Sequence, residues 1–97
     1  MAQPLSILIV EDETALAETH AEFIRQRSSR GQVWLAGDLA QARVMMTRFR
    51  PSLILLDNAL PDGKGITLLH ELTAAHSPCG VVFITASSDM DTVAEAV

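Results

Sequence analysis

The sequence has little of three things that would assign it to a particular class of protein: cysteine, basic residues and long apolar runs. Its only cysteine, Cys79, has no partner for an internal disulfide bond, which agrees with a reducing compartment. No apolar run approaches the roughly 20 residues that a transmembrane helix needs. The first segment, MAQPLSILIVEDE, has no basic residues before its apolar stretch, unlike a secretory signal. These absences argue against membrane association and favour the cytoplasm.

The shortage of basic residues bears on possible partners. The chain has 7 Lys and Arg against 12 Asp and Glu, a net charge of −5, and Lys64 is its only lysine. Because nucleic acids are bound through clustered lysine and arginine, this balance argues against binding of DNA by the chain itself. With 97 residues, 48% of them hydrophobic, and no repeat or linker, the sequence predicts one globular domain over residues 1–97.

Apolar segments alternate with segments of helical periodicity along the chain. The runs SILIV (6–10), QVWLA (32–36), LILL (53–56) and VVFIT (81–85) have the length and composition of buried strands. The segments after them repeat apolar residues at intervals of three and four, as amphipathic helices do. This alternation predicts right-handed βαβ units, and therefore an open, doubly wound α/β fold around a parallel sheet.

Each helical segment also predicts a face that packs on the sheet. Asp38 is suited to the N-cap of the second helix, and Ser88 to Asp91 resembles the start of the fourth. The residues expected on the four faces are, in chain order, Leu16, His20, Phe23 and Ile24; Leu39, Ala42, Met46 and Phe49; Ile66, Leu69, Leu72 and Thr73; and Met90, Val93, Ala94 and Val97.

Acidic and hydroxyl side chains follow the predicted strands at one edge of the sheet. Glu11 and Asp12 follow the first strand, Asp57 follows the third, and Thr85 ends the fourth. Ligands of open α/β sheets bind beyond the carboxyl ends of the strands, so we expect these side chains to converge. Neighbouring carboxylates repel one another, and Mg²⁺ relieves such repulsion while keeping positions for water and phosphate oxygens. The sequence therefore predicts a magnesium site.

Asp57 is also suited to covalent chemistry. An aspartate at the end of one strand is most often a turn residue, but here it has acids and a hydroxyl at matching strand ends. A carboxylate is ionised at neutral pH and can attack phosphorus to form an aspartyl phosphate, provided that a cation offsets the charge. We therefore expect Asp57 to be a nucleophile, with Glu11 and Asp12 as metal-site acids and Thr85 as a hydrogen-bond donor to a phosphoryl oxygen.

These segments resemble the receiver domain of two-component response regulators. The resemblance is carried by ILIVEDE at the first strand, ILLDNALPDGKG at the third and VVFITA at the fourth. Pro61 and Gly65 stand four and eight residues after Asp57, as in the family's motif. The resemblance covers almost all of the chain and implies the flavodoxin-like strand order 2-1-3-4-5.

The resemblance implies a role for each site residue. Asp57 would be the phosphoacceptor, Asp12 a direct Mg²⁺ ligand and Glu11 an acid that acts through water. The backbone carbonyl of Ala59 would complete the metal site. Thr85 would bond to the phosphoryl group and signal its presence. A partner histidine kinase would supply that group, so the chain would be a signalling domain rather than an enzyme.

Two features depart from the family's pattern. The acidic pair is Glu11 and Asp12 where the family often has two aspartates, and the family's invariant lysine ends a fifth strand, whereas Lys64 lies in another loop. A fifth strand and a last helix do not follow within the 97 residues, so we expect an incomplete receiver with strand order 2-1-3-4. PDGKGITLLHEL also resembles the citrate and C4-dicarboxylate regulators, whose helix-turn-helix output domain binds DNA and would be missing here.

Other interpretations stay open. A pseudo-receiver that only binds partner proteins would show no Mg²⁺ binding. A haloacid-dehalogenase-like phosphatase would carry its nucleophile after the first strand in an Asp-x-Asp motif, which Glu-Asp-Glu at 11–13 does not provide. His20, His70 and His76 have no second ligand at metal spacing and are expected to be structural or surface residues. An exposed edge beside the fourth strand would favour dimers or domain exchange.

Overall fold

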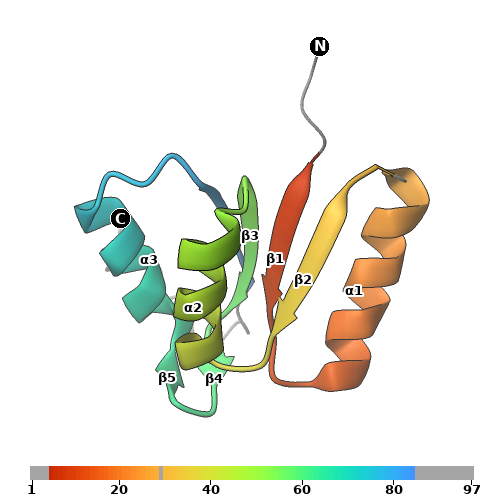
Figure 1. Ribbon diagram of the computed structural model, residues 1–97. Coiled ribbons are helices and arrows are strands. Elements are labelled where there is room, and N and C mark those ends of the chain that lie inside the picture. Colours follow the sequence, from red (N-terminus) through yellow and green to blue (C-terminus); the bar gives the residue numbers. More distant parts are fainter. Residues whose placement is uncertain (1–4, 29, 85–97) are drawn as a thin grey trace.

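A parallel sheet forms the centre of the molecule. The computed structural model describes residues 5–28 and 30–84. In it β1 (Ser6–Val10), β2 (Gln32–Ala36), β3 (Leu53–Asp57) and β6 (Gly80–Ile84) pair in parallel in the order β2-β1-β3-β6 (Figure 1). The expected order 2-1-3-4 and the open α/β fold are therefore confirmed. Thr85 and the predicted fourth helix lie outside the described residues.

Helices cover both faces of this sheet. In Figure 1, α1 (Thr14–Arg27) lies on one side, and α2 (Leu39–Phe49) and α3 (Gly65–Ala74) lie together on the other. Successive side chains of a strand point to opposite faces, so β1 serves both layers. Its Ile7 and Ile9 pack with α1, whereas Leu8 and Val10 join the larger cluster beneath α2 and α3. One apolar layer thus lies on each face of the sheet, and β1 contributes residues to both.

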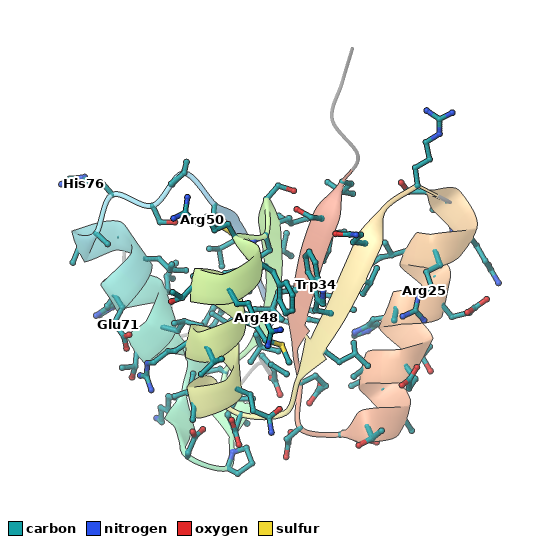
Figure 2. All side chains as sticks on the ribbon, in the orientation of Figure 1. Arg25, Trp34, Arg48, Arg50, Glu71 and His76 are labelled. Carbon is teal, nitrogen blue, oxygen red and sulfur yellow. The ribbon has the colours of Figure 1, made fainter. Side chains whose placement is uncertain are left out.

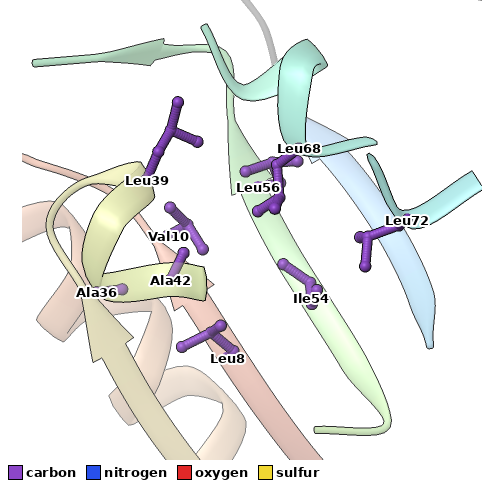
Figure 3. Packing of buried hydrophobic residues seen from close by; sticks show 9 residues of the cluster. All are labelled: Leu8, Val10, Ala36, Leu39, Ala42, Ile54, Leu56, Leu68 and Leu72. Atoms are coloured by element: carbon purple, nitrogen blue, oxygen red, sulfur yellow. The ribbon is translucent and has the colours of Figure 1, made fainter. Parts of the chain in front are cut away.

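The larger cluster lies beneath α2 and α3 and is shown in Figure 3. Leu56 and Ile54 of β3 are fully buried at its centre. Burying such a side chain stabilises the fold by about 1.5–3 kcal/mol, so these residues hold β3 firmly in the sheet. The cluster consists of Leu8, Val10, Ala36, Leu39, Ala42, Ile54, Leu56, Leu68 and Leu72.

The face predicted for α1 is only partly right, since Ile24 packs against the sheet as expected but Leu16 and Phe23 do not. Leu16 is 38% exposed and Phe23 56% exposed, while the residues that contact the sheet are Ala17 and Ala21, at 2% and 0%. Alanine lets the helix backbone approach the sheet closely, so small residues rather than large ones mark the buried stripe. Phe23 instead lies beside Arg27, whose guanidinium carbon is 3.6 Å from the ring centroid.

The face predicted for α3 is only partly right. Leu72 is buried as expected, but Leu68 is the other buried leucine and Thr73 is exposed. The Thr73 hydroxyl donates to the carbonyl of Leu69 at 2.9 Å, which satisfies it on the outside of the helix. In the first two turns the buried residues, Gly65 and Leu68, each come one position before the expected Ile66 and Leu69.

The boundaries of α2 follow the sequence signals closely. The Asp38 carboxylate accepts from the Gln41 N–H at 2.7 Å, which confirms its N-cap role. At the other end Arg50 adopts a left-handed conformation with φ of 49°, and Pro51 follows. Phe49 stacks on Trp34 of β2 with ring centroids 4.7 Å apart, so Trp34, labelled in Figure 2, is a packing residue.

The loop after β3 contains more structure than the expected turn. It forms a small antiparallel hairpin, β4 (Ala59–Leu60) with β5 (Gly63–Lys64), before α3 begins. Gly63 has φ of +148°, a conformation open mainly to glycine, which lets the two-residue turn close. Figure 1 places this hairpin at the same end of the molecule as the carboxyl ends of β1 and β2.

Within the described part of the chain, no helix has both the length and the apolar composition required to cross a bilayer.

Candidate metal centre

Strand register brings the acids of β1 and β3 to the same level. Val10 pairs with Leu56, so the next residues, Glu11 and Asp57, leave the sheet side by side. The Glu11 N–H donates to the carbonyl of Ala36 at 2.9 Å, which fixes where β1 ends against β2. Strand pairing therefore fixes the backbone from which both carboxylates extend.

Three carboxylates meet at this edge. One oxygen from each of Glu11, Asp12 and Asp57 lies within 4.8 Å of the others. Asp12 is exposed, whereas Glu11 and Asp57 are half-buried. The convergence expected for these acids is thus observed. It leaves a concentration of negative charge without a compensating lysine or arginine hydrogen-bonded to it among the described residues.

Crowding is most evident at Glu11. Partial burial, together with the neighbouring Asp12 and Asp57 carboxyl groups, raises the pKa of Glu11 from 4.5 to about 7. A hydrogen bond from the Glu13 N–H to the Glu11 carboxylate, 3.2 Å long, acts in the opposite direction. A proton or a cation is therefore needed at this site to balance the charge near neutral pH.

The donor set fits a hard divalent cation. Carboxylate oxygens are the ligands that Mg²⁺ prefers, and it uses only a few of them because it keeps several waters. An exposed Asp12 beside two half-buried acids leaves one side open to water and to a phosphate oxygen. The three carboxylates therefore suit Mg²⁺ better than Zn²⁺, which selects histidine and cysteine.

Two residues behind Asp57 hold its strand end; sequence reasoning assigned no role to Asn58 and indicated Gly65 only as a motif residue. Asn58 is only 1% exposed; its side-chain oxygen accepts from the Ile66 N–H at 3.1 Å, and its own N–H donates to the Ile84 carbonyl at 3.2 Å. A Cβ on Gly65 would overlap the carbonyl oxygen of Asp57, so α3 starts in direct backbone contact with the site. The signal in the sequence was a polar residue directly after an apolar strand, because a polar side chain in such a place is usually hydrogen-bonded.

The other expected site residues are placed as follows. Ala59 begins β4, and its N–H donates to the Asp57 carboxylate over 3.4 Å. Its proposed use of the backbone carbonyl as a metal ligand stays a prediction. Thr85 directly follows Ile84, which pairs with Asp57, but it lies outside the described residues. Lys64 is exposed on β5.

Residues 7–97 match the family model described as the response regulator receiver domain. Transcriptional regulatory protein DpiA of Escherichia coli strain K12 is 66% identical over 97 residues, and transcriptional regulatory protein CitB of Klebsiella pneumoniae is 42% identical over 92. The chain is covered to 100% and 95% in these two comparisons, but it spans only 43% and 39% of the length of the relatives.

Similarity to solved structures agrees with the family match. The MaeR response regulator bound to beryllium trifluoride superposes with a TM-score of 0.84 at 28% sequence identity. The alignment covers 95% of this chain and 75% of that one. The sheet order and the helices of this chain are thus those of solved receivers.

Proposed function

The chain belongs to the response regulator receiver domain family, and we propose that Asp57 is its phosphoacceptor, charged by a partner histidine kinase in a Mg²⁺-dependent reaction. The observation that carries this proposal is the cluster of Glu11, Asp12 and Asp57 at the carboxyl edge of the sheet. MaeR, a similar response regulator, binds beryllium trifluoride, which takes the tetrahedral shape of a phosphoryl group when its beryllium bonds to an oxygen. A site for such a group beside three acids accounts for why the acids are kept together.

The proposed reaction transfers a phosphoryl group between two side chains. An oxygen of the Asp57 carboxylate attacks phosphorus while the bond from phosphorus to the kinase histidine nitrogen breaks, and the imidazole keeps the electron pair and takes up a proton. Glu11, Asp12 and Asp57 would hold Mg²⁺, which would supply the positive charge that the phosphoryl oxygens need. The protein's contribution is position: the paired strand β3 and the buried Asn58 fix the nucleophile.

Each remaining residue has an assigned part. We propose that Asp12 binds the metal directly, that Glu11 binds it through water, and that the Ala59 carbonyl is a further ligand. For Thr85 we propose a hydrogen bond from its hydroxyl to a phosphoryl oxygen, which makes it the residue that registers phosphorylation. The chain then acts as a signalling domain that changes its preferred conformation on phosphorylation.

We further propose that this receiver controls transcription through a separate output domain. Two relatives are named transcriptional regulatory proteins, and each is more than twice as long as this chain's match. The acidic net charge of −5 makes the receiver itself a poor ligand for DNA, so a DNA-binding domain in the longer protein would carry that function. The receiver would contribute the switch, with its location in the cytoplasm beside its kinase.

The test is Mg²⁺-dependent phosphorylation by acetyl phosphate, followed by intact-protein mass spectrometry. The wild-type protein is expected to gain one phosphoryl group, and Asp57→Asn to gain none. Glu13→Gln is the matched control, because Glu13 is the neighbouring exposed acid outside the cluster and should leave labelling unchanged.

Two outcomes would overturn the proposal. Equal labelling of wild type and Asp57→Asn would show that another residue is the acceptor. An absence of labelling together with an absence of Mg²⁺ binding would favour the pseudo-receiver, a module that binds partners without phosphorylation.

A further inference from the structure

Asp62 joins the hairpin after Asp57 to the start of α2. Its two carboxylate oxygens accept from consecutive backbone groups: Oδ1 from the Leu39 N–H at 2.8 Å and Oδ2 from the Ala40 N–H at 3.0 Å. These bonds connect residues 22 and 23 positions apart in the chain. They lower the pKa of the Asp62 carboxyl, since the ionised form is the better acceptor.

The two aspartates at this helix end divide its free N–H groups between them. The first turn of any helix has N–H groups without partners inside the helix. Here the local cap, Asp38, serves Gln41, while Asp62 serves Leu39 and Ala40 from another part of the fold. The bonds from Asp62 therefore link the hairpin directly to the first turn of α2.

Apolar contacts bring the hairpin against the same place. Leu39 is 2% exposed, and a Cβ on Gly63 would lie 3.0 Å from its side chain, so the hairpin turn sits directly on this leucine. Leu60 packs against the larger core cluster. The base of the hairpin is held separately, where the Gly65 N–H donates to the Asn58 carbonyl at 2.9 Å. Both ends of the short segment that carries Ala59 are thus fixed.

We propose that Asp62 is a positioning residue for the metal site: by tying the hairpin tip to α2 it holds the Ala59 backbone where its carbonyl can reach Mg²⁺. This inference rests on the proposed function, which makes that carbonyl a ligand. Residues that orient metal ligands without touching the metal typically change metal affinity 10–100-fold when replaced. Asp62 acts in this way through the two-residue strand β4.

The test compares Asp62→Ala with Asp38→Ala in the purified protein. Both variants remove a cap from the same helix end, but only Asp62→Ala releases the hairpin. Mg²⁺ binding is measured by calorimetric titration, and hydrogen exchange of the peptide covering 58–65 is measured without metal. Asp62→Ala should weaken Mg²⁺ binding about tenfold and speed exchange in this peptide, while Asp38→Ala should change binding by less than about twofold.

A conservative variant separates the loss of the hydrogen bonds from a general loss of folding. Asp62→Asn keeps one oxygen acceptor and the size of the side chain, so its Mg²⁺ affinity should lie between those of wild type and Asp62→Ala. Equal losses of affinity in the alanine variants at positions 38 and 62 would overturn the inference, as would wild-type affinity in Asp62→Ala. Absence of Mg²⁺ binding in the wild type would reject the proposed function as well, so the two failures are distinguishable.

Discussion

Glu11, Asp12 and Asp57 are three acids that the fold forces together. Their positions at strand ends could be predicted from sequence, because apolar runs that stop on acids reveal the carboxyl edge of a parallel sheet. Asn58, Gly65 and Asp62 could not, since their roles depend on backbone groups that approach from α2 and α3. Periodicity contains no information about such tertiary hydrogen bonds.

Asp57→Asn should stabilise the protein in the absence of Mg²⁺. It removes one of three clustered charges, and for partly exposed groups the gain in the free energy of unfolding should be about 1 kcal/mol. Urea unfolding with a chelator measures it. At Mg²⁺ concentrations about 100 times the dissociation constant, the wild type should gain about 2.7 kcal/mol and the order should reverse. A variant less stable than wild type without metal would contradict the idea of charge crowding.

Gly65→Ala should damage the site through the backbone of Asp57. The added methyl group would overlap the Asp57 carbonyl oxygen, and the resulting strain should cost about 3 kcal/mol of unfolding free energy. Gly37→Ala is the control, because there the nearest atom to a new Cβ is the Gln41 side-chain oxygen at 3.8 Å; its effect should stay within about 0.5 kcal/mol. Thermal unfolding of the two variants decides, and similar melting temperatures would refute the close contact.

Among the elements, strands were predicted better than helix faces. The ranges expected for β1 and β2 coincide with those observed, since buried strands are continuous apolar runs. For α1 the large residues Leu16 and Phe23 suggested a stripe that the structure places outside, because Ala17 and Ala21 set the closest approach to the sheet. Hydrophobicity alone ranks phenylalanine above alanine, whereas close packing here required the smaller side chain.

The cap that Asp62 provides should make the stability of α2 depend on pH. The folded-state pKa of Asp62 is lowered from 3.8, so its contribution is fully present above that value and is lost as the pH falls through the lower folded pKa. Asp62→Asn should therefore be less stable than wild type at neutral pH, and the difference should shrink below about pH 4. Urea midpoints measured across this range provide the comparison. A constant difference down to pH 2 would mean that the charge of Asp62 is unimportant.

On the scale of the whole molecule, one sheet face carries exposed apolar residues beside α1. β6 pairs only with β3 among the described strands, and its Val82 and Ile84 are 45% and 40% exposed. Phe23 and Leu55 border the same apolar depression as Ile84. An exposed apolar face of this kind favours contact between chains, and two copies could cover each other's exposed side.

A protein limited to these 97 residues is expected to self-associate through this apolar face. Sedimentation velocity should show an average mass that rises with concentration. Val82→Lys should reduce the association, because a charge on this face opposes its burial between chains. Val44→Lys, at a position 64% exposed on α2 and away from this face, should leave it unchanged. A well-folded monomer at all concentrations would show that this face does not mediate self-association.

The proposed function requires that Asp57 receives a phosphoryl group in a site completed by Mg²⁺. The most direct measurement is mass spectrometry that locates the phosphoryl group within the peptides of the protein after reaction with acetyl phosphate. The account predicts one modified peptide, the one that contains Asp57, with modification that requires Mg²⁺ and falls when Glu11 and Asp12 are both replaced by their amides. A phosphoryl group on any other residue, or on Asp57 regardless of Mg²⁺ and of these two acids, would contradict it.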